Sequence, residues 1–224
     1  AVTDPDRRWK MEAAWRVRNL PDWDGMTMTE MLPAIPQGKI KALYIIGENP
    51  VISDADTDQV INPLQLLDFL VVQDIFLTET GKLAHVVLPA ASFAEKDGTF
   101  TNTERRVARV RQVIPPVGDS KPDWQIIAGI SRRLNHPMPF ADPEAIFEEI
   151  RRVTPSYAGI TYERLETEGG LQWPCPHPDH PGTVYLHRGQ FSRGRGHFFA
   201  IDYREPAEMP DADYPLVLTT GRVL

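Results

Sequence analysis

Three apolar stretches, separated by polar turns, organise the first half of the chain. The first, "KIKALYIIGENP" at 39–50, is rich in β-forming residues and is closed by Gly47 and Pro50, so it predicts a buried strand that leads into a turn. The stretches "FLVVQDIF" at 69–76 and "HVVLPA" at 85–90 have the same character. We therefore expect three buried strands in this half of the chain.

The segments between these strands follow a helical period. Residues 54–69 begin with several candidate N-caps and place Val60, Leu64 and Leu67 at helical spacing, and residues 78–84 predict a short helix. Alternation of strand and helix is typical of a parallel sheet that is covered on both faces. The sequence therefore predicts an α/β fold, with a Rossmann-like parallel sheet and helices on both of its faces.

Polar loops follow each predicted strand. Right-handed crossovers bring the C-terminal ends of parallel strands to one edge of the sheet, where such folds bind ligands. The loops at 47–56, 73–81 and 91–106 fall on that edge. The third loop carries both charge signs around Gly98 and Asn102, and a solvated loop or a loop built to hold a polar ligand would both explain it. Its charged residues are Glu95, Lys96, Asp97, Glu104, Arg105 and Arg106.

The remaining pattern divides the chain into parts. Residues 107–116 alternate like a half-exposed strand, and 122–134 and 142–153 predict two amphipathic helices. The predicted parts are an irregular segment at 1–37 with one short helix at 29–35, an α/β domain at 38–153, a proline- and glycine-rich connecting segment at 154–213, and the start of a further, truncated domain at 214–224.

Composition narrows the function classes. The chain has 224 residues and a formal net charge of -7, which gives no basic footprint for nucleic acid. No apolar run is long enough to span a bilayer. The start has no signal-peptide pattern and no initiator methionine, so we expect an internal piece of a longer protein. The single cysteine, Cys175, is compatible with a reducing compartment, and we expect a cytoplasmic location.

Phosphate-binding fingerprints are missing from the sequence. Neither GxGxxG nor GxxxxGK[ST] occurs. Gly47 and Asn49 tolerate unusual backbone angles that would let amides face a phosphate, although a plain turn after a strand explains them as well. Asp74, at the end of the second strand, could accept hydrogen bonds from ribose hydroxyls or from a base edge, or could cap a helix, and Thr78 fits either interpretation. Lys96 could neutralise a pyrophosphate or pair with a neighbouring acid.

The histidines and the cysteine give weak signals for chemistry. Cys175, His177 and His180 have metal-ligand residue types, but a zinc site usually needs a fourth ligand and regular spacing, so a lone loop cysteine is the favoured interpretation. The spacing supports no Ser-His-Asp constellation. The sequence predicts neither a metal ligand nor a catalytic residue in this chain.

Several long motifs carry a family resemblance. "ALYIIGENP", the run from "FLVVQDIF" to "TNTERRVARV", "KPDWQII", "TPSYAGITYERL", "GLQWPCP" and "YPLVLTTGRVL" occur in this order. Together they resemble the catalytic (alpha) subunit of molybdenum- or tungsten-dependent formate dehydrogenase. That subunit is a bis-molybdopterin guanine dinucleotide oxidoreductase related to dimethyl sulfoxide reductase and nitrate reductase. The resemblance covers about residues 38–224.

The resemblance implies which residues hold the cofactor. This region would be the second of two dinucleotide-binding-like domains and would hold one of two pterin guanine dinucleotides. Gly47, Glu48 and Asn49 would form the turn that faces the phosphates and the pterin, and Gln73, Asp74 and Thr78 would meet the guanosine end. Lys96 and Asp123 match cofactor contacts of the family. The start of the C-terminal barrel domain, which touches the pterin, would be Thr220, Gly221, Arg222, Val223 and Leu224.

The departures from the family are also informative. The cysteine motif for a [4Fe-4S] cluster and the metal-ligating cysteine or selenocysteine of complete members do not occur here, and Cys175 lies outside any such motif. The resemblance thus implies a fragment that does not oxidise formate alone, with formate as substrate and electron-transfer subunits as partners of the intact enzyme. Three alternatives stay open: a related nitrate reductase, a vestigial NADH dehydrogenase subunit, or a non-enzymatic nucleotide-binding or interaction module.

Overall fold

A parallel three-stranded sheet forms the centre of the first half of the chain. The computed structural model describes residues 2–54, 56–206 and 208–218. Its strands β1 (Ala42–Ile46), β2 (Phe69–Asp74) and β3 (Val86–Pro89) lie in the order β1-β2-β3, and both pairs are parallel. The helices α3 (Pro50–Ser53), α4 (Thr57–Gln65) and α5 (Glu79–Lys82) connect them. The predicted α/β class, a parallel sheet flanked by helices, is confirmed.

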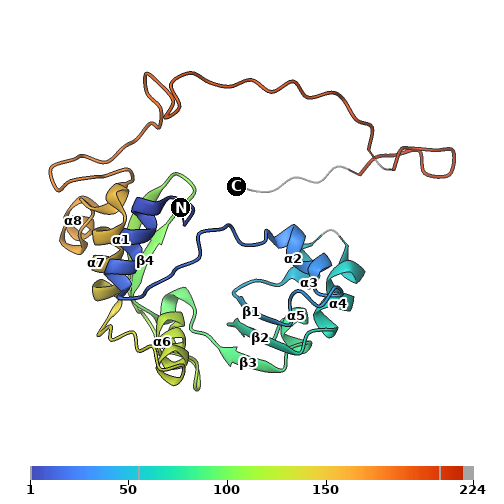
Figure 1. Ribbon diagram of the computed structural model, residues 1–224, viewed down its shortest axis with the longest axis horizontal. Coiled ribbons are helices and arrows are strands. Elements are labelled where there is room, and N and C mark those ends of the chain that lie inside the picture. The colour runs from blue at the N-terminus through green and yellow to red at the C-terminus, as the bar shows by residue number, and fades with distance from the viewer. Residues whose placement is uncertain (1, 55, 207, 219–224) are drawn as a thin grey trace. The chain divides into compact units, whose positions relative to one another are not determined.

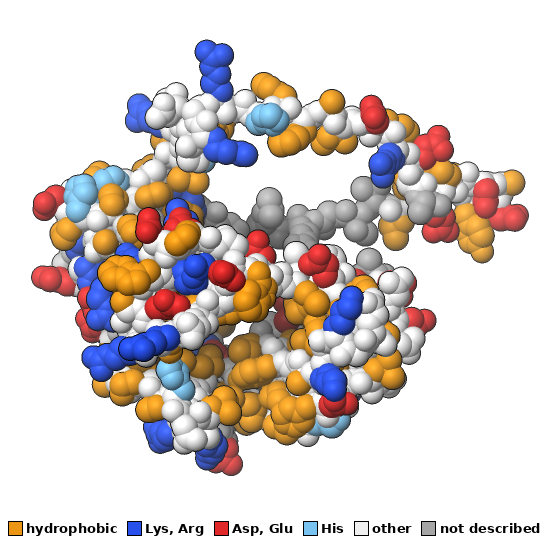
Figure 2. Space-filling view, viewed as in Figure 1, with side chains coloured by type: hydrophobic (Ala, Val, Ile, Leu, Met, Phe, Trp, Pro, Cys, Tyr) orange, Lys and Arg blue, Asp and Glu red, His pale blue; other side chains and the backbone are white. Residues whose placement is uncertain are grey.

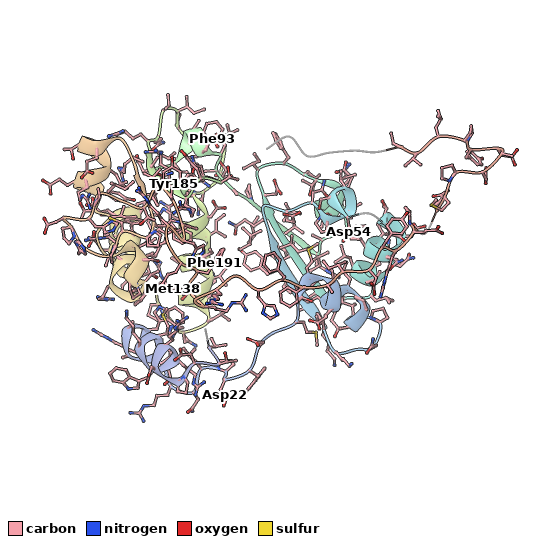
Figure 3. All side chains as sticks on the ribbon, turned by 90° about the horizontal axis from the view of Figure 1, so that it is seen from above. Asp22, Asp54, Phe93, Met138, Tyr185 and Phe191 are labelled. Atoms are coloured by element: carbon pink, nitrogen blue, oxygen red, sulfur yellow. The ribbon has the colours of Figure 1, made fainter. Side chains whose placement is uncertain are left out.

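One face of this sheet is packed against helices. Leu70 and Val72 of β2 have no exposed surface, and they pack with Val60 and Leu64 of α4, two of the positions that the helical period predicted. Full burial of one such side chain contributes about 1.5–3 kcal/mol. Asp54, which ends α3, lies on the same side of the strands as the helices (Figure 3). The apolar stripe of α4 therefore determines how this helix meets the sheet.

The opposite face is less covered than the sequence predicts. Because β1, β2 and β3 follow one another in one direction, right-handed crossovers place their connecting helices on the same side, and α3 contacts both α4 and α5 (Figure 1). Alternation along the strands turns Tyr44, Ile46, Phe69 and Val86 to the other face, where all four are exposed. Hydrophobic side chains reach the surface between charged ones in Figure 2.

A second sheet is antiparallel. Its strands β4 (Gly98–Thr101), β5 (Arg106–Val110) and β6 (Leu171–Gln172) lie in the order β4-β5-β6, and α6 (Asp123–Arg133), α7 (Pro143–Val153) and α8 (Tyr162–Glu168) separate β5 from β6 in the chain. Val107 of β5, Phe147 of α7 and Leu165 of α8 share one buried core. The strand and the two amphipathic helices predicted between 107 and 153 are confirmed, although the strand ends earlier, at Val110.

The polar stretch 91–106 was predicted to be a loop, and this prediction is wrong. It contains the 3-10 helix η1 (Phe93–Glu95) and the whole of β4, which pairs with β5 from Gly98 opposite Val110 to Thr101 opposite Val107. The turn between the strands is closed by Asn102, whose Oδ1 accepts the Arg106 N–H at 2.9 Å. Pairing with β5 makes this segment a strand, and its polar composition gives no sign of that.

Residues 154–184 pack inside the first compact unit, which spans Ala1–Val184. They include η2 (Pro155–Tyr157), α8 and β6. The Gly159 N–H donates to the Cys175 carbonyl at 2.7 Å, and Ile160 and Cys175 are fully buried. The unit therefore continues beyond residue 153, because β6 pairs with β5 and these buried side chains pack in one core with Val107 of β5.

The N-terminal segment contains two helices. α1 (Pro5–Trp15) begins at Asp4, whose Oδ1 accepts the N–H groups of Asp6 and Arg7, both at 3.1 Å. This helix has no buried residue, so it lacks the apolar period that would have predicted it. α2 (Met28–Ala34) begins with a capping box between Thr27 and Glu30 and agrees with the helix predicted at 29–35.

The second compact unit spans Tyr185–Leu224. Its described residues contain no helix and no strand beyond one isolated bridge between Phe191 and Gly194. The predicted start of a barrel domain at 214–224 lies partly outside the described residues and stays a prediction. Within the described ranges, every helix is too short or too polar to reach across a bilayer.

Candidate functional site

The C-terminal ends of β1 and β2 lie side by side. Ile46 pairs with Gln73, and the N–H of the next residue, Gly47, donates to the Gln73 carbonyl at 2.8 Å. Gly47 has a φ of 62°, in the left-handed region that favours glycine. An added Cβ there would meet no atom within 4 Å. Backbone conformation, and not crowding, is therefore the reason for this glycine, and the space beside the turn is open.

Asn49 is bonded within the fold. Its Oδ1 accepts the N–H of Thr80 at 3.1 Å and the Thr80 hydroxyl at 2.7 Å, while its Nδ2 donates to Glu79 at 2.9 Å. The hydrogen bond from Asn49 is the largest of the effects that lower the pKa of Glu79. The Asn49 side chain therefore ties the end of β1 to α5, and the predicted role of this residue at a phosphate is left to its backbone.

Glu48 and Thr78 also have partners of their own. The Ser53 hydroxyl donates to Glu48 Oε1 at 2.9 Å on the surface. Thr78 is the N-cap of α5, where its Oγ1 accepts the Gly81 N–H at 3.0 Å. Of the two interpretations that the sequence left open for Thr78, the structure shows the helix cap.

Only one of the two carboxylate oxygens of Asp74 accepts hydrogen bonds from the turn that follows it. Oδ1 accepts the N–H groups of Ile75 at 2.7 Å and Phe76 at 3.2 Å. Both bonds fall on that oxygen, and the half-buried carboxyl group lies at the end of β2. Ile75, Phe76 and Leu77 follow it as exposed apolar side chains. The sheet edge thus presents a carboxylate next to apolar surface.

Lys96, Asp123 and Gln73 come together in one polar network. Lys96 Nζ lies 2.5 Å from Asp123 Oδ2, and Gln73 Nε2 donates to Asp123 Oδ1 at 2.6 Å. The Tyr44 hydroxyl donates to Gln73 Oε1. Both acids that neighbour Lys96 in the sequence, Glu95 and Asp97, bond elsewhere, so the partner of Lys96 is remote in the sequence. Tyr44 is the member that the sequence did not single out, because an aromatic residue in a strand carries no such signal.

The network has its own electrostatics. Burial alone would raise the pKa of Asp123, but hydrogen bonds from Lys96 and Gln73, together with the Lys96 charge, lower it below the ordinary value of 3.8. Burial first, and then the negative charge of Asp123, raise the pKa of Tyr44. At neutral pH the network therefore contains an ionised carboxylate and a protonated phenol.

The other charges of 91–106 are used by the protein itself. The capping box of η1 joins Glu95 to Ser92, and Glu95 also accepts the Val117 N–H at 3.0 Å. Asp97 accepts the Gln112 N–H at 3.2 Å. Glu104 pairs with Arg106, and Arg105 donates to the carbonyls of Trp173, Thr183 and Val184. The side chain of Phe93 in η1 is exposed to solvent (Figure 3). Within this stretch, Lys96 is the charge that bonds to another predicted site residue.

A small pocket adjoins the Lys96–Asp123 pair. It has a volume of about 280 Å³ and lies between β4, α6 and α7, with Trp124 and Phe147 in its wall. Tyr162 also lines it, and the Tyr162 hydroxyl is buried without a hydrogen-bond partner in the described part of the chain. Lys96 and Asp123 thus line a pocket together with apolar side chains.

Cys175 is packed as a core residue. It is fully buried, and its thiol donates to the His180 carbonyl at 3.4 Å and lies 3.4 Å from an Arg164 nitrogen. The described residues contain no group of three His, Cys, Asp or Glu side chains placed to hold a metal ion. Five further predicted site residues lie outside the described residues: Thr220, Gly221, Arg222, Val223 and Leu224.

The family match and similar relatives point to the same class of enzyme. Residues 12–133 match the molybdopterin oxidoreductase family. The chain is 52% identical over 218 residues to F420-dependent formate dehydrogenase subunit alpha of Methanocaldococcus jannaschii, covering 95% of this chain and 32% of that protein. It is 36% identical over 225 residues to formate dehydrogenase H of Escherichia coli, covering 99% and 32%. The chain thus spans about a third of the length of these relatives.

A solved structure supports the fold. Acetylene hydratase from Pelobacter acetylenicus superimposes with a TM-score of 0.52 and 23% identity, covering 65% of this chain and 20% of that one. At this identity the likeness concerns the fold alone.

Proposed function

We propose that this chain, which belongs to the molybdopterin oxidoreductase family, is part of the catalytic subunit of a formate dehydrogenase and holds one molybdopterin guanine dinucleotide. The observation that carries the proposal is that Gly47, Gln73 and Asp74 lie at the C-terminal ends of neighbouring parallel strands, and that Gln73 bonds to the Lys96–Asp123 pair there. Relatives named as formate dehydrogenases, at 36–52% identity, favour formate over the other substrates of the family.

The residues at this edge fit a dinucleotide. The turn at Gly47 has open space beside it, where backbone amides can approach a phosphate. Both hydrogen bonds to Asp74 fall on Oδ1, which leaves Oδ2 for hydroxyls of a ribose or N–H groups of a base. The Lys96 ammonium has three donors, and Asp123 takes one of them.

We assign parts of the ligand to these residues by their chemistry. The backbone of Gly47, Glu48 and Asn49 would face the phosphates, because the Glu48 carboxylate has the same charge sign as a phosphate and the Asn49 side chain is already bonded. Asp74 would meet the guanosine end, where exposed Phe76 offers an apolar surface for a flat base.

The other predicted contacts follow from position. Thr78 would approach the guanosine end while it caps α5, and Lys96 with Asp123 would lie beside a phosphate. Thr220 to Leu224, outside the described residues, would complete the site at the pterin.

When bound, the cofactor, with molybdenum or tungsten, would supply the two-electron redox chemistry that converts formate to carbon dioxide and a proton. Residues of this chain bind and orient it. A [4Fe-4S] cluster and electron-transfer subunits, both outside this sequence, would carry the electrons onward. A cytoplasmic location stays a prediction.

The test uses the full-length protein that contains this sequence. We expect molybdenum or tungsten by elemental mass spectrometry, oxidised-pterin fluorescence, and formate oxidation with a dye acceptor. Asp74→Asn keeps the Oδ1 acceptor of the local turn and converts Oδ2 to a donor, so it should lower cofactor content without loss of the fold. Asp142→Asn is the matched control, since Asp142 caps α7 through one bond to Ala145.

Each outcome separates the alternatives. Full cofactor content in Asp74→Asn would contradict the site assignment. A protein that lacks metal and pterin would instead support the vestigial subunit or the interaction module. Cofactor with nitrate reduction and no formate oxidation would support the nitrate reductase.

A further inference from the structure

The geometry points to Gln73 as a positioning residue, which holds Asp123 and, through it, the Lys96 ammonium at the sheet edge, and does not itself meet the ligand. The nature of the ligand rests on the proposed function above. The positioning of Lys96 does not, because it is a property of the polypeptide. This replaces the earlier expectation that Gln73 contacts the guanosine end.

Hydrogen-bond chemistry fixes the orientation of the Gln73 amide. An ionised carboxylate only accepts hydrogen bonds, so the group that faces Asp123 Oδ1 at 2.6 Å must be the amide nitrogen. The carbonyl oxygen then faces the Tyr44 hydroxyl, which donates to it. Both ends of the amide are therefore used by protein partners.

Burial removes Gln73 from contact with a ligand. The residue is 0% exposed, whereas Asp74, the next residue, is half-buried and turns the other way along the strand. A ligand that bonded to Gln73 would have to displace the Tyr44 hydroxyl or the Asp123 carboxylate from the buried Gln73 amide. Asp74 is therefore the residue at the end of β2 that can bond to a ligand, whereas Gln73 acts on the site through Asp123.

The Gln73 bond also determines where Lys96 points. A carboxylate held at Oδ1 has its rotation fixed, so Oδ2 faces the Lys96 ammonium at 2.5 Å. A lysine has a flexible four-carbon stem and loses its freedom only where a partner holds it. The Lys96 side chain is 22% exposed, so its remaining donors have access to an anion outside the network.

The bonds connect distant elements. Gln73 lies next to the last residue of β2, Asp123 begins α6, and Lys96 directly follows η1. The Gln73 amide thus joins the parallel sheet to α6, and Asp123 in turn bonds to Lys96. The arrangement predicts that Gln73 and Asp123 act on Lys96 as one unit, and that a change at either residue has the same consequence for the lysine.

The experiment measures the reactivity of Lys96 in the full-length protein. We replace Gln73 by methionine, which keeps length and volume but removes both hydrogen bonds, and follow acetylation of Lys96 by an N-hydroxysuccinimide ester with peptide mass spectrometry. Loss of about 1 kcal/mol of restraint corresponds to about fivefold faster labelling of Lys96. Lys82, on α5, is the internal reference and should keep its rate.

The matched control is Gln172→Met. Gln172 is also a buried glutamine whose Nε2 donates to an acid, Glu104, but it lies in β6 away from Lys96. It should leave the labelling of Lys96 unchanged. If Gln73→Met fails to fold, Tyr44→Phe takes its place. It removes only the bond to Gln73 Oε1, so it should also speed the labelling of Lys96, but by a smaller factor. Unchanged Lys96 labelling in the variant that folds overturns the positioning role.

A double variant distinguishes positioning from direct contact. If Gln73 acts through Asp123, the cofactor content of Gln73→Met with Asp123→Asn equals that of Asp123→Asn alone. A further loss in the double variant, with Lys96 labelling unchanged, would mean that Gln73 touches the ligand. If the wild-type protein carries no cofactor, the proposed function fails, while the labelling result still decides the role of Gln73.

Discussion

Asn49 and Thr80 are joined by two hydrogen bonds across the sheet edge. Asn49 Oδ1 accepts both the main-chain N–H of Thr80 at 3.1 Å and its hydroxyl at 2.7 Å, and the Thr80 oxygen in turn accepts the Val51 N–H at 3.2 Å. Thr80 is fully buried. The asparagine of the "GENP" turn is thus a structural tie between β1 and α5, and it shapes the turn that Gly47 opens.

Removal of this tie should destabilise the protein. Asn49→Ala leaves two buried donors of Thr80 without an acceptor, so we expect the free energy of unfolding to fall by about 1–3 kcal/mol. Urea denaturation followed by circular dichroism measures the change. Ser53→Ala, which removes only the exposed bond to Glu48, should stay within about 0.5 kcal/mol. Equal effects of the two variants would show that the tie carries no stability.

Gly159 should not tolerate a side chain. An added Cβ would lie 2.1 Å from the His177 carbonyl oxygen and 2.9 Å from that of Cys175, both main-chain atoms that cannot rotate away. We expect Gly159→Ala to cost about 3 kcal/mol or to prevent folding. Gly25→Ala, at a position where an added Cβ meets nothing within 4 Å, is the control. Thermal unfolding compares them, and a wild-type melting temperature for Gly159→Ala would contradict the close approach.

Two arginines that share one acid should respond differently to lysine. Arg109 lies 3.6 Å from the centre of the Tyr162 ring and 3.0 Å from Glu166, and its side chain is 15% exposed. Arg111 pairs with the same Glu166 but is 59% exposed. Because lysine cannot stack its charge flat on a ring, Arg109→Lys should cost about 1 kcal/mol. Arg111→Lys should be close to neutral in the same denaturation experiment, and the reverse order would argue against the stacking.

The pH dependence of stability should reveal Asp123. Its pKa is lowered in the folded state, so its contribution is present above the ordinary value of 3.8 and is lost as the pH falls through the lower, folded value. Other carboxylates with lowered pKa values titrate in a similar range, so the comparison is with Asp123→Asn, which removes the titrating carboxyl group and leaves the residues Lys96 and Gln73 in place. We expect the stability difference between wild type and variant to shrink below about pH 4. A constant difference down to pH 2 would contradict an ionised Asp123.

The sequence predicted the elements that a local period encodes. The three parallel strands, α4 and the two amphipathic helices between 122 and 153 follow from apolar residues at spacings of two or between three and four. α1 buries no residue, so no period marks it. The hairpin strand β4 is polar and pairs with β5, which is a relationship between two segments. The residues predicted for the site after β1 and at the end of β2 lie at one edge of the parallel sheet, which follows from the strand order, but their bonds to one another were not predictable.

The sequence by itself determined the class of fold, the edge of the sheet where the polar residues gather, and the resemblance to a family, because these depend on residue types at short spacings and on motif order. Only the tertiary structure decided that Lys96 pairs with Asp123 and not with its neighbours, that Gln73 is closed off beneath the edge, and that Asn49 and Thr78 serve α5. Those outcomes depend on which groups meet across elements that are remote in the chain. Most buried polar groups in folded proteins have a hydrogen-bond partner, and the fold decides which partner each of these groups meets.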